Sequence, residues 1–137
     1  MIKKEISYTD FDGVYHEKEP FWFNLTTAEC IELEAIGKGG LEGYIRRLIS
    51  SDNQLEIVKI IKKVILMAYG EKSIDGTKFM KNDQIRDSFA ATEAYSVLFT
   101  ELLTNEEECS KFMNGIAPKT KVPDKPETVQ TTAVTVE

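Results

Sequence analysis

The central helix of this protein is predicted by the sequence QLEIVKIIKKVILMAY at residues 54–69. Between Leu55 and Tyr69, the only polar residues are the charged residues Glu56, Lys59, Lys62 and Lys63. At helical spacing they leave a narrow solvent-facing stripe on a helix that is otherwise buried. Ile61 and Ile65 lie four residues apart on the most apolar face, so we expect both in the core. Gly70 follows, and we expect it to end the helix.

Shorter helices are predicted on both sides of this segment. Thr26 and Glu29 form a capping box, in which each side chain pairs with the other residue's backbone amide. Cys30, Leu33 and Ile36 follow at helical spacing, and the glycines at 37, 39 and 40 are expected to stop that helix. Residues 41–49 repeat the pattern, and the sequence SDNQ at 51–54 is expected to begin the central helix.

Three more helix boundaries are predicted after the central helix. Asn82 or Asp83 can cap a helix that bears Ile85 and Phe89, and apolar residues at 95, 98, 99, 102 and 103 continue the helical period. Thr104-Asn105-Glu106-Glu107 has the pattern of a further capping box. Gly115 and Pro118 are expected to close the folded part.

The first residues predict an antiparallel hairpin. An Asp-Phe-Asp-Gly turn at 10–13 separates two β-prone segments between Ile2 and Phe23. Pro20 cannot donate a ladder hydrogen bond, so the second strand should be interrupted near it or have an edge there. A second Asp-Gly, within residues 72–79, indicates either a small hairpin, an ordered turn or a plain loop.

Together these patterns predict an α+β fold in which an N-terminal antiparallel β-hairpin packs on a bundle of about five to six short α-helices. The folded domain is expected to span 1–116, with the hairpin in 1–24 and the helical part in 25–116. Residues 117–137 carry three of the four prolines and no aromatic residue. Such a tail has too little apolar surface to offset its ordering entropy, and we predict that it is disordered.

Composition excludes several classes of function. The chain has 137 residues, of which 42% are hydrophobic and 29% charged, as in an ordinary single soluble domain. Its formal charge of -6 opposes binding to nucleic acid or to anionic lipid. No stretch approaches the roughly 20 apolar residues of a membrane span, and no signal peptide is evident. Cys30 and Cys109 are not in metal-ligand spacing and are expected to be reduced thiols, so no metal or cofactor is predicted.

Candidate catalytic residues are few. His16 beside Glu17 is a conceivable acid-base pair, but a solvated strand residue is the preferred interpretation. Cys30 in the first turn of a helix is interpreted as a buried small residue rather than as an activated thiol. The glycines around Lys38 lack the spacing of a phosphate loop, and the glutamates at 106–108 complement a helix dipole. We therefore predict no catalytic residue.

Two groups of residues are candidate partner-binding sites. Phe21, Trp22 and Phe23 follow one another on a predicted strand, so Trp22 must face opposite to its neighbours. The face of the strand that does not pack on the helices must be buried by other residues, either from this chain or from a second one. The second group is the basic cluster of Lys59, Lys62 and Lys63, which suits an acidic partner helix if it is more than a solvated face.

Four blocks carry a resemblance to a known family. They are residues 21–26 (FWFNLT), 68–79 (AYGEKSIDGTKF), 99–104 (FTELLT) and 112–116 (FMNGI). In this order and spacing, over about residues 6–116, the chain resembles the tail assembly chaperones of long-tailed, siphovirus-like phages that infect Gram-positive bacteria. The resemblance implies a non-enzymatic factor in the host cell cytoplasm that keeps the tape measure protein soluble during tail-tube polymerisation and is absent from the mature virion.

The resemblance also implies partners. Family members are commonly made in two lengths, and a programmed ribosomal frameshift appends to the longer form a domain that recruits the tail-tube protein. Self-association of the chaperone on its client is a further expectation. The alternative from composition alone is a small phage or host regulatory protein that acts by protein-protein binding. A small hydrolase that depends on His16 or Cys30 is the rival from the enzyme class.

Overall fold

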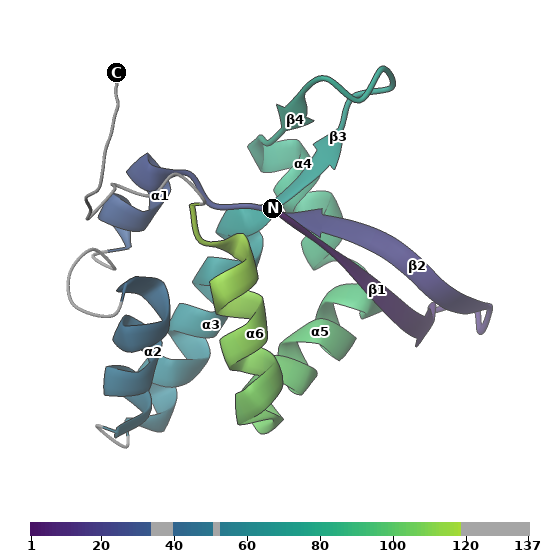
Figure 1. Cartoon of the computed structure of the whole chain (residues 1–137). Coiled ribbons are helices and arrows are strands. Elements are labelled where there is room, and N and C mark those ends of the chain that lie inside the picture. Colours follow the sequence, from purple (N-terminus) through teal and green to yellow (C-terminus); the bar gives the residue numbers. More distant parts are fainter. Residues whose placement is uncertain (34–39, 51–52, 119–137) are drawn as a thin grey trace.

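The computed structural model describes residues 1–33, 40–50 and 53–118. Its elements in chain order are β1 (Ile2–Thr9), β2 (Tyr15–Phe23), α1 (Thr27–Glu32), α2 (Gly40–Ser50), α3 (Gln54–Ala68), β3 (Tyr69–Lys72), β4 (Phe79–Met80), α4 (Asp83–Ala90), α5 (Glu93–Thr104) and α6 (Glu106–Ile116). The strands form one antiparallel sheet in the order β1-β2-β3-β4. Figure 1 shows the β1–β2 hairpin projecting beyond the helices that pack beneath it. The predicted α+β class with an N-terminal hairpin is confirmed.

The hairpin has the predicted turn. Asp10 accepts hydrogen bonds from the backbone amides of Asp12 and Val14, and Gly13 adopts a φ of 84°. Pro20 pairs with Glu5 of β1, whereas β3 pairs only with residues 22 and 23 of β2. The side of β2 opposite to β1 is therefore an edge at Pro20, as predicted.

The central helix passes directly into a strand, which corrects the predicted role of Gly70. Ile61 and Ile65 are buried as predicted, with 1% and 0% of their surface exposed. Tyr69 is the C-cap of α3 and the first residue of β3, so Gly70 lies in the sheet. A Cβ atom at Gly70 would lie 2.7 Å from the ring of Phe79. A larger residue at this position would therefore force the Phe79 ring to move.

Several helix boundaries match the sequence. The Thr26 capping box is present, Asn53 caps α3, and Asn82 rather than Asp83 caps α4. The Asp-Gly segment at 72–79 forms the small hairpin of β3 and β4, and Gly76 has a φ of 75°. Of the alternatives for this segment, the hairpin is confirmed.

Other boundaries differ from the prediction. Helix α1 ends at Glu32 with Leu33 as its C-cap, while Ile36 and the glycines at 37 and 39 lie outside the described residues. Asn105 caps α6, because Thr104 is the last residue of α5 and its hydroxyl donates to the carbonyl of Thr100. Gly115 lies inside α6 and does not end it. The predicted disorder of the tail falls outside the described residues from 119 onward.

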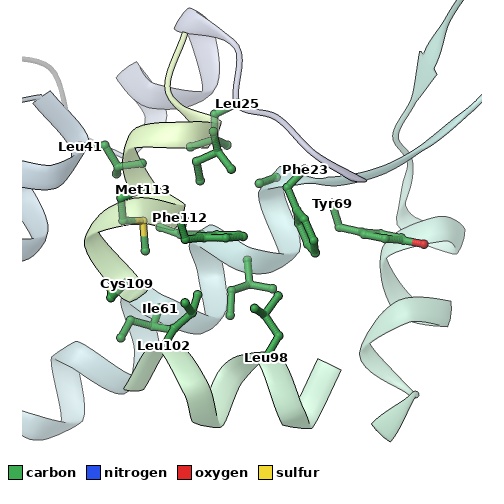
Figure 2. Packing of buried hydrophobic residues seen from close by; sticks show 14 of the residues in the cluster. Phe23, Leu25, Leu41, Ile61, Tyr69, Leu98, Leu102, Cys109, Phe112 and Met113 are labelled. Carbon is green, nitrogen blue, oxygen red and sulfur yellow. The ribbon is translucent and has the colours of Figure 1, made fainter. Parts of the chain in front are cut away.

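Aromatic residues from four elements form the centre of the core, and Figure 2 shows three of them, Phe23, Tyr69 and Phe112. Phe23 is fully buried, with ring centroids 5.2 Å from Phe112 of α6 and 5.6 Å from Tyr69 of β3. Tyr69 stacks on Phe89 of α4 at 4.1 Å. Backbone bonds join the end of β2 to two helices, since the amides of Asn24 and Leu25 donate to the last carbonyls of α3 and α6. The sheet and the helix ends are therefore held as one unit.

Candidate functional site

The aromatic run is divided between the two faces of β2. Phe21 and Phe23 are buried, with 9% and 0% of their surface exposed, whereas Trp22 is half-buried on the opposite face. The ammonium of Lys72 lies 4.0 Å above the centre of the Trp22 ring, and that of Lys3 lies 5.8 Å from it. The predicted alternation is confirmed. Because Phe21 and Phe23 are core residues of this chain, Trp22 is the only one of these three candidates that is accessible to a partner.

The basic cluster lies on one exposed face of α3. Lys59, Lys62 and Lys63 are all exposed, and none of them forms an ion pair within the described part of the chain. Their spacing continues to Leu66 and Met67, which are only partly buried against the core. The exposed face of α3 is therefore wider than the stripe of polar residues predicted from the sequence. It combines the three lysines with the apolar side chains of Leu66 and Met67.

This face forms the floor of a groove of about 510 Å³. Glu29 and Glu32 of α1 and Arg86 of α4 complete its lining. We call it the lysine groove; its residues are Glu29, Glu32, Lys59, Lys62, Lys63, Leu66, Met67 and Arg86. The three predicted lysines are thus brought together with residues from two other helices. Trp22 is not among the groove residues.

The walls of the lysine groove are fixed to the floor by two cations. The ammonium of Lys81 donates to the Glu29 carboxylate at 2.6 Å and to the Met67 carbonyl at 2.9 Å. Arg86 donates from Nε to the Leu66 carbonyl at 3.0 Å and pairs with Asp83 at 2.8 Å. Carbonyls at the end of a helix lack partners within that helix, and cations are favoured there. These contacts therefore tie α1 and α4 to the end of α3.

Lys81 and Arg86 were missed by sequence reasoning. Each meets the end of α3 only because the β3–β4 hairpin and the start of α4 fold back over it. No local periodicity or short motif marks a contact of this kind. The sequence offers only a general signal: Lys and Arg side chains that follow a helix can bind its last carbonyls.

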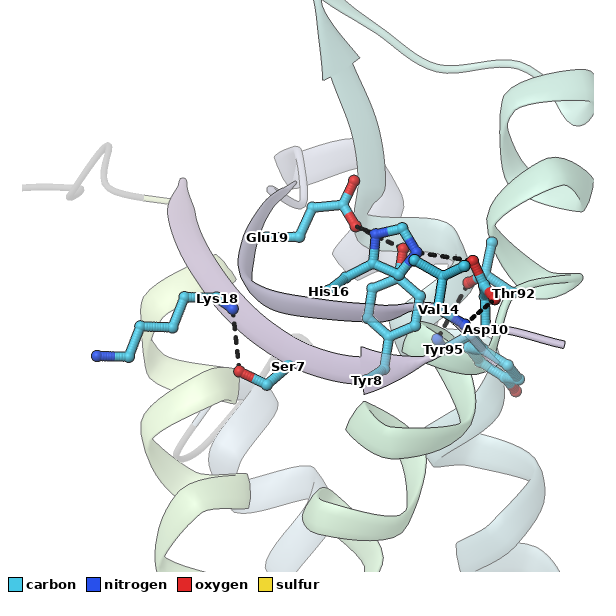
Figure 3. A network of polar contacts seen from close by, with 9 residues as sticks. All are labelled: Ser7, Tyr8, Asp10, Val14, His16, Lys18, Glu19, Thr92 and Tyr95. Atoms are coloured by element: carbon cyan, nitrogen blue, oxygen red, sulfur yellow. Dashed lines mark hydrogen bonds and ion pairs between the residues drawn. The ribbon is translucent and has the colours of Figure 1, made fainter. Parts of the chain in front are cut away.

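His16 lies on β2 as predicted, and its partly exposed ring also belongs to a polar network (Figure 3). Its ring stacks on Tyr8 at 4.6 Å, and Nε2 lies 2.8 Å from Oδ2 of Asp10. The Tyr8 hydroxyl donates to Glu19, whose carboxylate lies 3.7 Å from Nδ1 of His16. The hydrogen bond from His16 lowers the pKa of Asp10, while burial and then Glu19 raise the pKa of Tyr8 to about 12.

The network joins β1, β2 and their turn, and its contacts account for the position of His16 without a substrate. Cys30 is buried as predicted, and its pKa is raised by burial and by Glu29, so its thiol stays protonated at neutral pH. Among residues 1–33, 40–50 and 53–118, no cluster of three His, Cys, Asp or Glu side chains is arranged to hold a metal ion. Over the same ranges, the helices are all too short or too polar to cross a membrane.

Comparison with known protein families gives a match. A family model described as phage tail assembly chaperone matches residues 1–134. No curated protein and no solved structure matches the chain. The match covers the hairpin, all the described helices and the lysine groove. On this evidence, the chain belongs to the phage tail assembly chaperone family.

Proposed function

We propose that this chain binds the tape measure protein of its phage, keeps it soluble, promotes polymerisation of the tail tube around it, and is not retained in the mature virion. The observation that carries the proposal is the family match over residues 1–134. Membership establishes a chaperone role in tail assembly. The client is inferred from the resemblance described above, and it is the tail component that most needs a chaperone.

The physical properties of the chain support this client. A long helical tape measure protein exposes apolar stripes before the tube encloses it, and such stripes promote aggregation. A small domain with a net charge of -6 gives the client to which it binds a negative surface, and charge repulsion between such complexes keeps the client soluble. Several copies on one client reinforce one another, so each contact can remain weak enough to allow release.

The setting of the proposal follows from the same resemblance. We place the protein in the host cell cytoplasm during assembly of a siphovirus-like phage of Gram-positive bacteria. A longer product of a programmed frameshift is proposed to bring the tail-tube protein to the client. Self-association is proposed to occur between neighbours on the tape measure protein.

Co-expression with the tape measure protein of the same phage tests the proposal. We expect the tape measure protein to move from the pellet to the soluble fraction and to carry several chaperone copies, measured by size exclusion with light scattering. An unrelated acidic domain of similar size, co-expressed at the same level, should leave it insoluble.

One outcome would contradict the proposal. If the tape measure protein stays in the pellet at every ratio and light scattering detects no complex, the chain acts on another component of the tail. Pull-down with the tail-tube protein would then identify the alternative client.

A further inference from the structure

We propose that the lysine groove binds an acidic amphipathic helix. Carboxylates of this helix would pair with Lys59, Lys62 and Lys63, and its apolar side chains would pack on Leu66 and Met67. The inference rests on the proposed function, since the helix is assigned to the tape measure protein. It adds to that function the contact surface and the chemistry of the bound segment.

The first argument is electrostatic. Acidic residues outnumber basic ones in this chain, 23 to 17, yet the groove floor presents three neighbouring lysines. Other cations nearby are paired: Lys81 with Glu29, and Arg86 with Asp83. The ammonium groups of Lys59, Lys62 and Lys63 have no such partners within the described residues. Their charge is available to an acidic ligand.

The second argument concerns apolar surface and length. Leu66 and Met67 continue the lysine face toward the end of α3 and remain only partly buried. The floor from Lys59 to Met67 extends about 12 Å along the axis, since a helix rises about 1.5 Å per residue. A groove of about two helical turns that combines lysines with apolar side chains is complementary to a helix with one acidic and one apolar face.

The third argument is that the walls are already in place. Lys81 ties α1 to the end of α3, and Arg86 ties α4 to it. Helices that are already in position add no rearrangement of their own to the ordering cost of binding. Because Lys81 neutralises Glu29, the exposed Glu32 is the wall residue whose charge repels a carboxylate. The bound helix is therefore expected to place neutral or basic residues beside α1.

A peptide titration tests the groove without the phage client. The probe is a two-heptad peptide with leucine at the first and fourth heptad positions, glutamate on the flank that would face the lysines, and alanine elsewhere to favour a helix. Its counterpart carries lysine in place of every glutamate. We expect amide shifts in NMR spectra of the chaperone at residues 59–67, at 29–32 and at Arg86, with the acidic peptide only. High salt should weaken the binding because it screens exposed charges.

Matched charge reversals identify the residues responsible. The groove variant is Lys59→Glu, Lys62→Glu and Lys63→Glu; the control variant is Lys18→Glu, Lys78→Glu and Lys111→Glu, which changes the net charge equally at other exposed positions. We expect the groove variant to bind the acidic peptide at least about tenfold more weakly and the control to bind almost normally. Circular dichroism melting would verify that both variants are folded. Equal binding by both variants, or shifts confined to other surfaces, would overturn the proposal.

Repeating the co-expression with these variants separates the two proposals. If wild type and control dissolve the tape measure protein and the groove variant does not, both proposals are supported. If all three dissolve it, the groove is not the contact surface, although the proposed function stands. If wild type itself fails, the proposed client is wrong, and the assignment of the helix to it fails as well. The peptide titration then still decides whether the groove accepts an acidic helix.

Discussion

At the scale of single residues, Lys81 joins three segments through one side chain. Its ammonium donates to the carbonyls of Asn24 and Met67 and to the carboxylate of Glu29. The first partner follows β2, the second lies near the end of α3, and the third belongs to α1. The Lys81 side chain is only 14% exposed, so water cannot easily take the place of its ammonium group at these three acceptors.

Replacing Lys81 with methionine tests this role. Lys81→Met keeps the apolar stem but removes all three donors and leaves Glu29 without its cation. We expect a loss of about 2–3 kcal/mol in the free energy of unfolding, measured by urea denaturation. Lys78→Met is the control, because Lys78 is exposed and should change stability by less than about 0.5 kcal/mol. Equal losses in the two variants would show that the three contacts contribute little.

Asp75 gives a prediction for pH dependence. Its carboxylate accepts from the Ser73 hydroxyl at 2.6 Å and from the amide and hydroxyl of Thr77 at 3.0 and 2.8 Å. These bonds, that of Ser73 first, lower its pKa from 3.8 to about 2. Because the folded pKa is the lower one, the stabilisation is complete above about pH 4 and is lost as the pH falls toward 2.

NMR titration of the Asp75 carboxyl group measures this directly. We expect a midpoint near pH 2 in the wild type. Ser73→Ala removes the bond with the largest effect and should move the midpoint toward the ordinary value. A wild-type midpoint near 3.8 would show that the β3–β4 turn is not ordered as described.

At the scale of elements, the sequence predicted where helices and strands exist better than where they end. Capping side chains act on amides three residues away, and for that reason the boundaries at Thr26, Asn53 and Asn82 were predictable. Adjacent Thr104 and Asn105 can each cap, and the choice of Asn105 depends on how far α5 continues. Local sequence does not fix that length.

Gly70 and Gly115 share a role that the sequence did not predict. Glycine often ends a helix, so Gly70 was expected to end the central helix, and Gly115 was expected to close the folded part together with Pro118. Instead each allows a distant segment to approach: a Cβ at Gly70 would meet Phe79, and one at Gly115 would lie 2.4 Å from Cγ2 of Ile2. The Ile2 contact joins positions near the two ends of the fold. A single sequence contains no sign of it.

Gly115→Ala tests the helix-to-strand contact. Alanine should favour helix α6 by about 1 kcal/mol. The clash with Ile2 opposes this, because a β-branched side chain moves its Cγ2 only by changing rotamer. We expect a net loss of about 1–3 kcal/mol in chemical denaturation. In an Ile2→Ala background, the same change should become neutral or stabilising, and additive effects would contradict the contact.

At the scale of the whole molecule, the candidate site was predictable only in part. The lysine face of α3 follows from helical spacing within nine residues, so the sequence indicated it. The groove depends on α1 and α4, which are distant in sequence and are held by Lys81 and Arg86. The alternation of Phe21, Trp22 and Phe23 was predictable from strand geometry, whereas the face that is buried depended on the packing of α4 and α6.

The neighbouring aromatics of β2 provide the last prediction, since they separate folding from client binding. Phe23→Ala removes a fully buried ring at the centre of the core and should cost about 3–5 kcal/mol. Trp22→Ala removes a half-buried ring on the opposite face, where the ammonium groups of Lys3 and Lys72 make cation–π contacts with it. Exposed cation–π contacts contribute about 0.5–1 kcal/mol to stability. We therefore expect a near-normal melting temperature for Trp22→Ala only.

Client binding completes the comparison. An aromatic side chain at an interface often contributes about 2 kcal/mol or more to binding. If Trp22 contacts the tape measure protein, Trp22→Ala should fold normally yet form smaller complexes in light scattering. Complexes of wild-type size would exclude Trp22 from the interface and leave the lysine groove as the contact surface. A melting temperature as low as that of Phe23→Ala would instead show that the half-buried Trp22 ring stabilises the sheet as much as a core residue does.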